Sequence, residues 1–483
     1  MTLPYDPAQG DAFWATIKDI PGYPTAGIDI PTRVMLFESG ALFKLPEVLA
    51  AVGADPSQPV LVPMDPTPMQ RGQDSLKPLV LDVLREAGWG AEQLVFEPDA
   101  SGQVHCDVRQ IDAVKERLHE GMAVVSVGSG AVTDTVKQAC HFYEEETGYH
   151  VPYVCYQTAN SVVAYLSHTA SVTIKGMKRT LLSRLPDALV CDLETLRDAP
   201  PEMAAAGVGD LVAAFISLPD WFMANRLGMD ETYTEFVQRL MGPLDDILLE
   251  KAEAIRSGSL EGTAVLAKLL SLGALSMSVS GVTTPMSGFE HGISHVLDLQ
   301  GGLEERPLAL HGLQVALATI MAAEVYRRLL TELEPAEVNV DACYPSTGTM
   351  RERIEKAFAE VDPSGKTGQE VWEIFQKKLD AWHGQRDKFE AVLSDWPSFR
   401  EKIEETWRTP ERTAEILRAV DSPMSFDALT PPIPEEQVKF AFMNGVLMRG
   451  RFTIGDLLLF LQWDRETLWQ QVWDVSQKMA EQA

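Results

Sequence analysis

The strongest constraint on the fold is a regular alternation of strand-type and helical runs between residues 58 and 192. Runs such as "QPVLVPMD" and "MAVVSVGSG" are continuous apolar stretches, and the segments between them space apolar residues three and four apart. The remaining strand-type runs are "EQLVFEP", "VPYVCYQT" and "ALVCDL", and the helical runs are "LKPLVLDVLREAGW", "IDAVKERLHEG" and "AVTDTVKQACHFYEEE". Strands that alternate with helices predict a mostly parallel sheet.

The pattern changes near residue 194. From Thr195 onward almost every run predicts a helix, as in "GDLVAAFISLPDWFMANRL" and "LQVALATIMAAEVYRRLLTEL". We therefore expect an α/β domain over residues 1–194 and an all-α domain over residues 195–483. The stretch from about 351 to 420 is rich in Glu, Lys, Arg and Trp, and its composition predicts solvated helices.

Composition excludes several classes of partner. The formal net charge is -29, which repels phosphate backbones, so no nucleic acid is expected. We expect no membrane association either, because no apolar run reaches membrane-spanning length and the N-terminus lacks the pattern of a signal peptide. The scattered cysteines form no CxxC pair, which indicates reduced thiols in a cytoplasmic protein. They are Cys106, Cys140, Cys155, Cys191 and Cys343.

Three of the nine histidines fall in one short region. His291 and His295, in "SGFEHGISHVLDL", are four residues apart and share one face of a predicted helix, and His311 follows in "LALHGLQV". Imidazole is the commonest metal ligand in proteins, and a catalytic metal takes three protein ligands. Taken alone, two histidines at this spacing are more often a surface pair or a satisfied core pair than a set of metal ligands.

A glycine turn follows the strand in "VVSVGSGAVTDTVK". Gly128, Ser129 and Gly130 stand between this strand and the next helix, where backbone N–H groups and the helix dipole favour a phosphate group. The third glycine of the usual dinucleotide motif is missing, so a tight strand-to-helix connection remains an alternative. Asp134 belongs with these candidate cofactor residues, or it merely favours the first turn of the helix.

Four segments, taken in order, identify a known family. The segments "GSGAVTDTVK", "AAAGVGDLVA", "DWFMA" and "SGFEHGISHVLD…LHGLQV" resemble the glycerol-1-phosphate dehydrogenase branch of the iron-containing alcohol dehydrogenase superfamily. The resemblance runs from roughly Thr32 to Leu461 and includes "RGRFTIGDLL" near the C-terminus. It implies the dehydroquinate synthase-like fold, an NAD(P) cofactor and one divalent metal, either zinc, nickel or iron.

The resemblance also implies roles for individual residues. The metal ligands become Asp210 in "GVGD", His291 and His311. His295 relays a proton near the nicotinamide, unless it is a core histidine bonded to a carbonyl group. From the residues alone, Asp210 is also a candidate N-cap, because an apolar helix follows it.

For the cofactor, the resemblance places Asp65 against the adenosine ribose. A carboxylate there accepts a bond from the ribose 2′-OH and repels a 2′-phosphate, so we expect NAD(H) to be preferred over NADP(H). Thr158 and Ser161, in "QTANS", match the stretch beside the nicotinamide. The complete predicted set is Asp65, Gly128, Ser129, Gly130, Asp134, Thr158 and Ser161.

Three positions depart from the family pattern. Val163 stands where the family has an aspartate, Thr284 where it has an arginine, and Ala214 where many members have a lysine. A phosphorylated substrate needs cations to hold its phosphate. The metal and cofactor residues are therefore retained, whereas substrate recognition is rewritten.

The resulting prediction is a cytoplasmic, homodimeric, metal-dependent NAD(P) oxidoreductase that acts on a small molecule. Glycerol-1-phosphate or a related polyol or carbonyl compound is the expected substrate. Two alternatives stay open: a cyclase or lyase like dehydroquinate synthase that uses NAD transiently, and a non-catalytic relative that keeps the fold for binding. Net consumption of NADH separates the oxidoreductase from the cyclase or lyase, and loss of the metal favours the non-catalytic relative.

Overall fold

The computed structural model describes residues 3–24, 30–174 and 177–482. The chain divides into two compact units, and neither is one continuous stretch of sequence. The first unit comprises Met1–Leu211, Thr234–Thr283 and Ala419–Asp421, and the second comprises Val212–Tyr233, Thr284–Arg418 and Ser422–Ala483. The expected boundary at residue 194 marks the change from strands to helices in the sequence. The compact units differ from it because several later helices belong to the same unit as the sheet.

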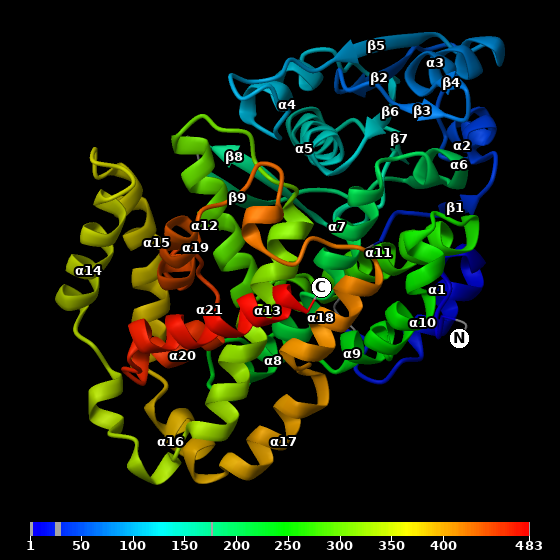
Figure 1. The fold of residues 1–483 in the computed structure, drawn as a ribbon. Coiled ribbons are helices and arrows are strands. Elements are labelled where there is room, and N and C mark those ends of the chain that lie inside the picture. The colour runs from blue at the N-terminus through cyan, green and yellow to red at the C-terminus, as the bar shows by residue number, and fades with distance from the viewer. Residues whose placement is uncertain (1–2, 25–29, 175–176, 483) are drawn as a thin grey trace. The chain divides into compact units, whose positions relative to one another are not determined.

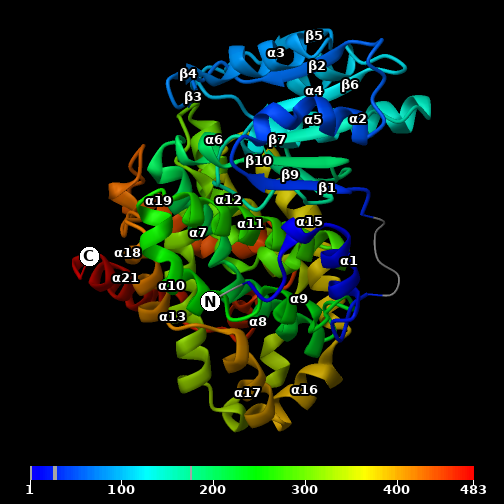
Figure 2. The ribbon, with the colours of Figure 1, turned by 90° about the vertical axis from the view of Figure 1, so that its right-hand side faces the viewer.

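The first unit contains the predicted parallel sheet. Among the described residues six strands form it, in the order β1-β10-β7-β6-β2-β5, and every adjacent pair is parallel. Figure 2 shows this order, with β5 at the top and β1 at the bottom. The strands are β1 (Val34–Glu38), β2 (Val60–Met64), β5 (Ala91–Val95), β6 (Ala123–Gly128), β7 (Tyr153–Gln157) and β10 (Ala188–Asp192). β2, β6, β7 and β10 are buried along their whole length, which explains their unbroken apolar runs.

Helices and two hairpins complete the first unit. The antiparallel hairpins, which the sequence pattern did not predict, are β3 (Gln70–Arg71) with β4 (Asp74–Ser75) and β8 (Thr169–Ile174) with β9 (Met177–Leu182). The α-helices are α1 (Asp11–Lys18), α2 (Leu45–Ala51), α3 (Leu76–Glu86), α4 (Val108–Lys115), α5 (Gly130–Thr147), α6 (Leu193–Arg197), α7 (Pro201–Leu211), α9 (Phe236–Met241), α10 (Leu244–Arg256) and α11 (Leu260–Ser280). One core cluster joins residues of α2 and α3 to residues of the sheet, including Leu49, Val62 and Leu84.

The described residues of the second unit contain helices and no strand, as the sequence predicts for this half. The α-helices are α8 (Ala214–Arg226), α12 (Phe289–Leu303), α13 (His311–Glu332), α14 (Thr347–Ala359), α15 (Lys366–His383), α16 (Arg386–Ser394), α17 (Trp396–Thr406), α18 (Pro410–Ala419), α19 (Glu435–Asn444), α20 (Ile454–Phe460) and α21 (Arg465–Glu481). Two short 3-10 helices matter below, η3 (Thr284–Met286) and η7 (Gly445–Leu447).

Helix α12, which carries two of the three clustered histidines, is buried along most of its length. It packs against α13, α19 and η7. Gly292 meets Gly445 backbone to backbone, since a Cβ on Gly292 would lie 3.0 Å from the Gly445 oxygen. A side chain at either glycine would therefore push α12 away from η7.

The charged stretch from 351 to 420 forms most of α14 and all of α15 to α18, and α14 and α15 lie side by side (Figure 1). The expectation of solvated helices is wrong for one face of α15. Trp382 is fully buried and stacks on Phe460, with ring centroids 5.1 Å apart. Lys378 is buried beside Asp456, with its Nζ 2.6 Å from Oδ1. The composition of a segment averages over both faces of a helix, so the charged residues of the outer face masked the apolar residues of the buried face.

Two helical segments are long and apolar enough to cross a membrane, Pro201–Arg226 and Leu260–Ser280. This differs from the expectation that no run reaches that length. Of their most apolar windows, 78% and 83% respectively are buried inside the structure, as in the core helices of a globular protein.

Candidate metal and cofactor site

The carboxylate of Asp220 fixes the start of α12. Its Oδ2 accepts the backbone N–H of Phe289 at 2.8 Å. Its Oδ1 accepts the N–H of Ile454 at 2.8 Å and the hydroxyl of Tyr326 at 2.6 Å. Burial and the charge of the nearby Glu290 raise the pKa of Asp220 well above its ordinary value. One side chain on α8 thereby ties together the first turns of α12 and α20 and the middle of α13.

Gly288, directly before α12, has no room for a side chain. A Cβ there would lie 2.6 Å from Asp220 Oδ2 and 2.8 Å from Glu290 Oε2. Real Cβ atoms do not approach other atoms so closely, so only glycine lets the two carboxylates reach the start of this helix.

Three histidine rings gather at this end of the second unit. The ring centroids of His291 and His311 are 5.2 Å apart, and those of His295 and His311 are 5.8 Å apart. His291 and His295 are 6.3 Å apart, as expected for side chains one turn apart on α12. His291 and His295 are buried, and His311, the first residue of α13, is half-buried.

The ring of His291 is oriented by its neighbour in the sequence. Nδ1 of His291 lies 2.8 Å from Oε1 of Glu290, and the same oxygen accepts the N–H of Gly288 at 2.6 Å. Because Oε1 is an acceptor, Nδ1 carries the ring hydrogen, and Nε2 keeps its lone pair. A carboxylate behind a histidine in this way is typical of metal ligands.

Asp210 lies near the end of α7, with its carboxylate buried. Its Oδ2 accepts the N–H of Val163 at 2.6 Å. Helix α7 lies close to this loop because Gly207 leaves no gap: a Cβ there would lie 2.2 Å from the Asn160 oxygen. The alternative in which Asp210 caps the start of a helix is wrong, because α7 begins at Pro201.

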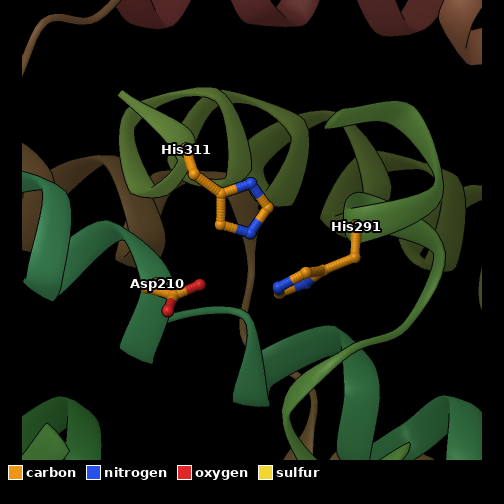
Figure 3. Close-up of side chains that lie close together, drawn as sticks. All are labelled: Asp210, His291 and His311. Atoms are coloured by element: carbon orange, nitrogen blue, oxygen red, sulfur yellow. The ribbon is translucent and has the colours of Figure 1, made fainter. Parts of the chain in front are cut away.

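Possible ligand atoms of Asp210, His291 and His311 all lie within 4.8 Å of one another. Figure 3 shows the three side chains directed toward a common point. Two nitrogen donors and one carboxylate oxygen suit zinc, nickel or iron, and three protein ligands leave a position open for substrate. The chemistry of this donor set therefore fits a divalent cation, and the structure brings together the three residues that the resemblance implies as ligands.

The predicted glycine turn connects β6 to α5. Gly128 ends the strand, Ser129 takes the N-cap position without a capping bond from its side chain, and Gly130 begins the helix. Both glycines are required by packing: a Cβ on Gly128 would lie 2.4 Å from Val132 Cβ, and one on Gly130 would lie 2.8 Å from Val162 Cγ2. The turn at a helix N-terminus has the geometry that phosphate groups use.

Thr158 lies beside this turn and offers a group that the protein does not use. Its backbone N–H donates to the Gly128 oxygen at 3.2 Å, and its buried hydroxyl has no hydrogen-bond partner among the described residues. Leaving such a hydroxyl unpaired costs about 1–3 kcal/mol. Its place next to Gly128 fits a polar group of a bound cofactor. Ser161, in the same loop, is buried.

Asp65 and Asp134 are both engaged with lysines. Lys77 Nζ lies 2.7 Å from Asp65 Oδ1, and the same oxygen accepts the N–H of Thr67 at 2.9 Å. Lys137 Nζ lies 2.8 Å from Asp134 Oδ1, and Asp134 Oδ2 accepts the N–H of Ser171 in β8 at 3.0 Å. Asp134 thus holds α5 to β8. The carboxylate of Asp65 is not isolated, because it forms an ion pair with Lys77.

The three departures from the family pattern are buried positions. Val163 is 8% exposed, Thr284 in η3 is 7% exposed, and Ala214 at the start of α8 is 2% exposed. Val163 contributes its backbone N–H to Asp210 and keeps an apolar side chain. No charge is present at any of these three positions.

Sequence reasoning missed the residues that support the histidines. Asp220 and Glu290 lie inside the quoted segments "DWFMA" and "SGFEHG", so an acid directly before a candidate ligand was the available signal. Arg451 donates to the Ser287 oxygen just before α12. Lys378 holds the backbone of this arginine, since its Nζ donates to the Arg451 oxygen at 3.3 Å. Nothing in the local pattern around Lys378 indicates this contact.

Known proteins with related sequences give the next comparison. The family model for iron-containing alcohol dehydrogenases matches residues 36–200. The glycerol-1-phosphate dehydrogenase (NAD(P)+) of Bacillus subtilis is 27% identical over 371 residues, covering 77% of this chain and 78% of that relative. The enzyme with the same name from Pyrococcus furiosus is 33% identical over 202 residues, covering 42% of this chain and 55% of that relative.

Solved structures show the same fold. A probable glycerol dehydrogenase from Sinorhizobium meliloti matches with a TM-score of 0.55 at 16% identity, covering 94% of this chain and 98% of that chain. The NADH-dependent butanol dehydrogenase A of Thermotoga maritima matches with a TM-score of 0.52 at 15% identity, covering 94% and 99% respectively. The chain is therefore similar in sequence to glycerol-1-phosphate dehydrogenases, its residues 36–200 match the family model for iron-containing alcohol dehydrogenases, and the solved structures show that it shares the fold of these dehydrogenases.

Proposed function

We propose that the protein is a metal-dependent NAD(P)-linked oxidoreductase that transfers hydride between a nicotinamide and a polyol, a polyol phosphate or a related carbonyl compound. The observation that carries this proposal is the set formed by Asp210, His291 and His311, whose possible ligand atoms lie within 4.8 Å of one another. Relatives called glycerol-1-phosphate dehydrogenase supply the reaction class.

The three residues would hold one divalent cation, either zinc, nickel or iron. When bound, such a cation supplies Lewis acidity toward a substrate oxygen. Two residues of the chain orient the ligands. Glu290 holds Nδ1 of His291, which leaves Nε2 available for the cation, and the backbone N–H of Val163 holds one carboxylate oxygen of Asp210. A ligand set that is oriented before binding loses little freedom when the substrate arrives.

The cofactor would lie against the turn from Gly128 to Gly130, with the Thr158 hydroxyl and Ser161 beside it. Asp65 favours NAD(H), because a carboxylate opposes a 2′-phosphate. The ion pair with Lys77 offsets part of that charge, so the preference is modest. Asp134 supports this site indirectly, because it accepts a hydrogen bond from β8 and forms an ion pair with Lys137.

His295 is proposed to exchange a proton with the substrate oxygen or with the nicotinamide ribose. Its buried ring lies 5.8 Å from that of His311 and 6.3 Å from that of His291, centroid to centroid. A histidine suits proton exchange near neutral pH. A His295→Gln variant should then retain metal and NADH but lose turnover, whereas full turnover would leave His295 as a core residue.

The cellular context follows from chemistry. All five cysteines are free and buried, as in a reducing compartment. We propose a cytoplasmic homodimer with a small-molecule substrate and with neither nucleic acid nor membrane as a partner. Light scattering of the purified protein measures the dimer directly.

The deciding experiment measures metal content and turnover together. We expect about one divalent cation per chain in the wild type, and much less in His311→Ala. Oxidation of NADH is then followed with a panel of polyol-derived ketones and aldehydes, with each candidate metal supplied in turn. Equal metal content in the two proteins would remove His311 from the ligand set. Turnover without net consumption of NADH would indicate the cyclase reading instead.

A further inference from the structure

We infer that Gln314 sets the tautomer of His311 through the hydroxyl group of Ser294, and is therefore a positioning residue for the metal site. This inference rests on the proposed function for its biological meaning. The hydrogen bonds that support it join neighbouring residues of α12, of α13 and of the connection between them. No feature of the sequence motifs had singled out Gln314 or Ser294.

The amide of Gln314 has a defined orientation. Its Nε2 donates to the backbone oxygen of Ala309 at 3.0 Å and to Oδ1 of Asp298 at 3.0 Å. A backbone carbonyl oxygen accepts hydrogen bonds and cannot donate them, so the NH₂ end must face this side. The residue is 1% exposed, so no solvent competes for the amide. Its oxygen, Oε1, consequently points the other way, toward Ser294.

Ser294 has one hydrogen to place and two neighbours to satisfy. Its Oγ lies 3.2 Å from Gln314 Oε1 and 3.1 Å from Nδ1 of His311. Oε1 can only accept, so the hydroxyl hydrogen points at Gln314. The serine oxygen then offers a lone pair to His311, and Nδ1 must carry the ring hydrogen. Nε2 of His311 is left with the lone pair that a metal requires.

The two histidine ligands thus reach the same tautomer by different means. Glu290 holds Nδ1 of His291 directly, at 2.8 Å. Nδ1 of His311 lies beside a neutral hydroxyl, that of Ser294, which by itself could point either way. Gln314 removes that ambiguity. Without it, the Ser294 hydroxyl is free to donate to Nδ1, and the ring hydrogen moves to Nε2, the atom needed for the metal.

A double-mutant cycle separates this role from simple packing between α12 and α13. The variants are Ser294→Ala, Gln314→Met and the double variant, with zinc affinity measured by competition with a chelating dye. If Gln314 acts through the serine hydrogen, Gln314→Met weakens zinc binding by about tenfold to a hundredfold. The same change in the Ser294→Ala background has little further effect, because no misdirected hydroxyl remains. Additive losses would overturn the inference.

The matched control is Gln300→Met. Gln300 is a buried glutamine of α12, with 5% exposure, and it is not one of the residues whose hydrogen bonds link Asp298 to His311. Its variant should keep wild-type zinc affinity. Equal losses in Gln300→Met and Gln314→Met would mean that any buried glutamine matters alike, and the inference would fail. Thermal unfolding of each variant verifies that the fold is retained.

A second readout needs neither metal nor activity. Long-range ¹H–¹⁵N correlation spectra of metal-free protein with labelled histidine distinguish the Nδ1–H and Nε2–H forms, and His311→Ala assigns the signals. We expect Nδ1–H in the wild type and a shift toward Nε2–H in Gln314→Met. An unchanged tautomer in this variant would overturn the inference. Wild-type protein that binds no divalent metal would instead overturn the proposed function, while the spectra would still decide the tautomer.

Discussion

Glu290 Oε1 lies 2.8 Å from Nδ1 of His291, so a ligand candidate and the carboxylate that orients it are consecutive residues of one helix. We expect Glu290→Ala to weaken zinc binding by about tenfold to a hundredfold, because the imidazole loses both its orientation and part of its basicity. Glu290→Gln keeps an acceptor oxygen and should lose less. Competition with a chelating dye measures both affinities.

Glu435 of α19 provides the control for this experiment, since Glu435→Ala removes the same type of side chain from an exposed position. If Glu290→Ala and Glu435→Ala bind zinc equally well, the carboxylate does not orient the ligand.

The ion pair between Asp65 and Lys77 makes the cofactor preference testable in two directions. We expect the wild type to bind NADH more tightly than NADPH. Asp65→Asn should narrow the difference, because the repulsion of the 2′-phosphate is lost. Lys77→Met should widen it, because the carboxylate then keeps its full charge. Titrations that follow nicotinamide fluorescence measure all six dissociation constants. Tighter binding of NADPH to the wild type would show that Asp65 does not meet the ribose.

His150 makes the stability of the protein depend on pH. Hydrogen bonds with Asp187 and Glu144 raise the pKa of His150 to about 9. A histidine with a raised pKa contributes its full stabilisation below its ordinary pKa of 6.5, and the contribution disappears as the pH rises through 9. His150→Gln should therefore lower the free energy of unfolding at pH 6 and leave it almost unchanged at pH 10. The side chain is 58% exposed, so the effect is small.

Urea unfolding at the two pH values provides this comparison. His119→Gln is the matched control, because His119 is exposed and its Nδ1 lies 3.1 Å from a backbone oxygen, that of Glu120, in place of a carboxylate. A loss at pH 10 as large as the loss at pH 6 would mean that His150 acts by packing and not by charge.

Dihydroxyacetone phosphate is expected to be a poor substrate. Val163 offers no side-chain hydrogen bond to a substrate hydroxyl, and an unpaired buried hydroxyl costs about 1–3 kcal/mol. Thr284 lacks the charge-assisted contact of an arginine, which is worth about 1.5–3 kcal/mol. Together these losses predict kcat/KM about two to four orders of magnitude below that of a relative with both charged residues. Oxidation of NADH by the metal-loaded enzyme tests this, and an ordinary kcat/KM would show that the substitutions are tolerated.

The sequence predicted those parts of the fold whose pattern is local. β2, β6, β7 and β10 are buried on both faces, so each appears as an unbroken apolar run. β1 was missed because it alternates between buried and half-buried positions at the edge of the sheet. The hairpin of β8 and β9 was missed as well, since most of its residues are only partly buried.

Some residues of the site were likewise predictable from a local pattern, and others were not. His291 and His295 share a helical face, which spacing reveals, whereas Asp210 entered the set only through a family resemblance. Residues that act through long-range contacts left no local signal. Asp220 accepts a bond from Ile454, which is 234 positions further along the chain. Gln314 matters because of the direction of a hydrogen bond, which no pattern of residue types encodes.

The five buried cysteines have a practical consequence for spectroscopy. Burial raises the pKa of Cys140 to about 12 and that of Cys343 to about 11, and it also raises the pKa values of Cys106, Cys155 and Cys191. Thiolates are the nucleophiles that attack maleimides and thiol-reactive spin labels, so the folded protein presents these reagents with almost no native target. One cysteine introduced at an exposed position, such as Glu435, would then be the single labelling site, with every native thiol left in place.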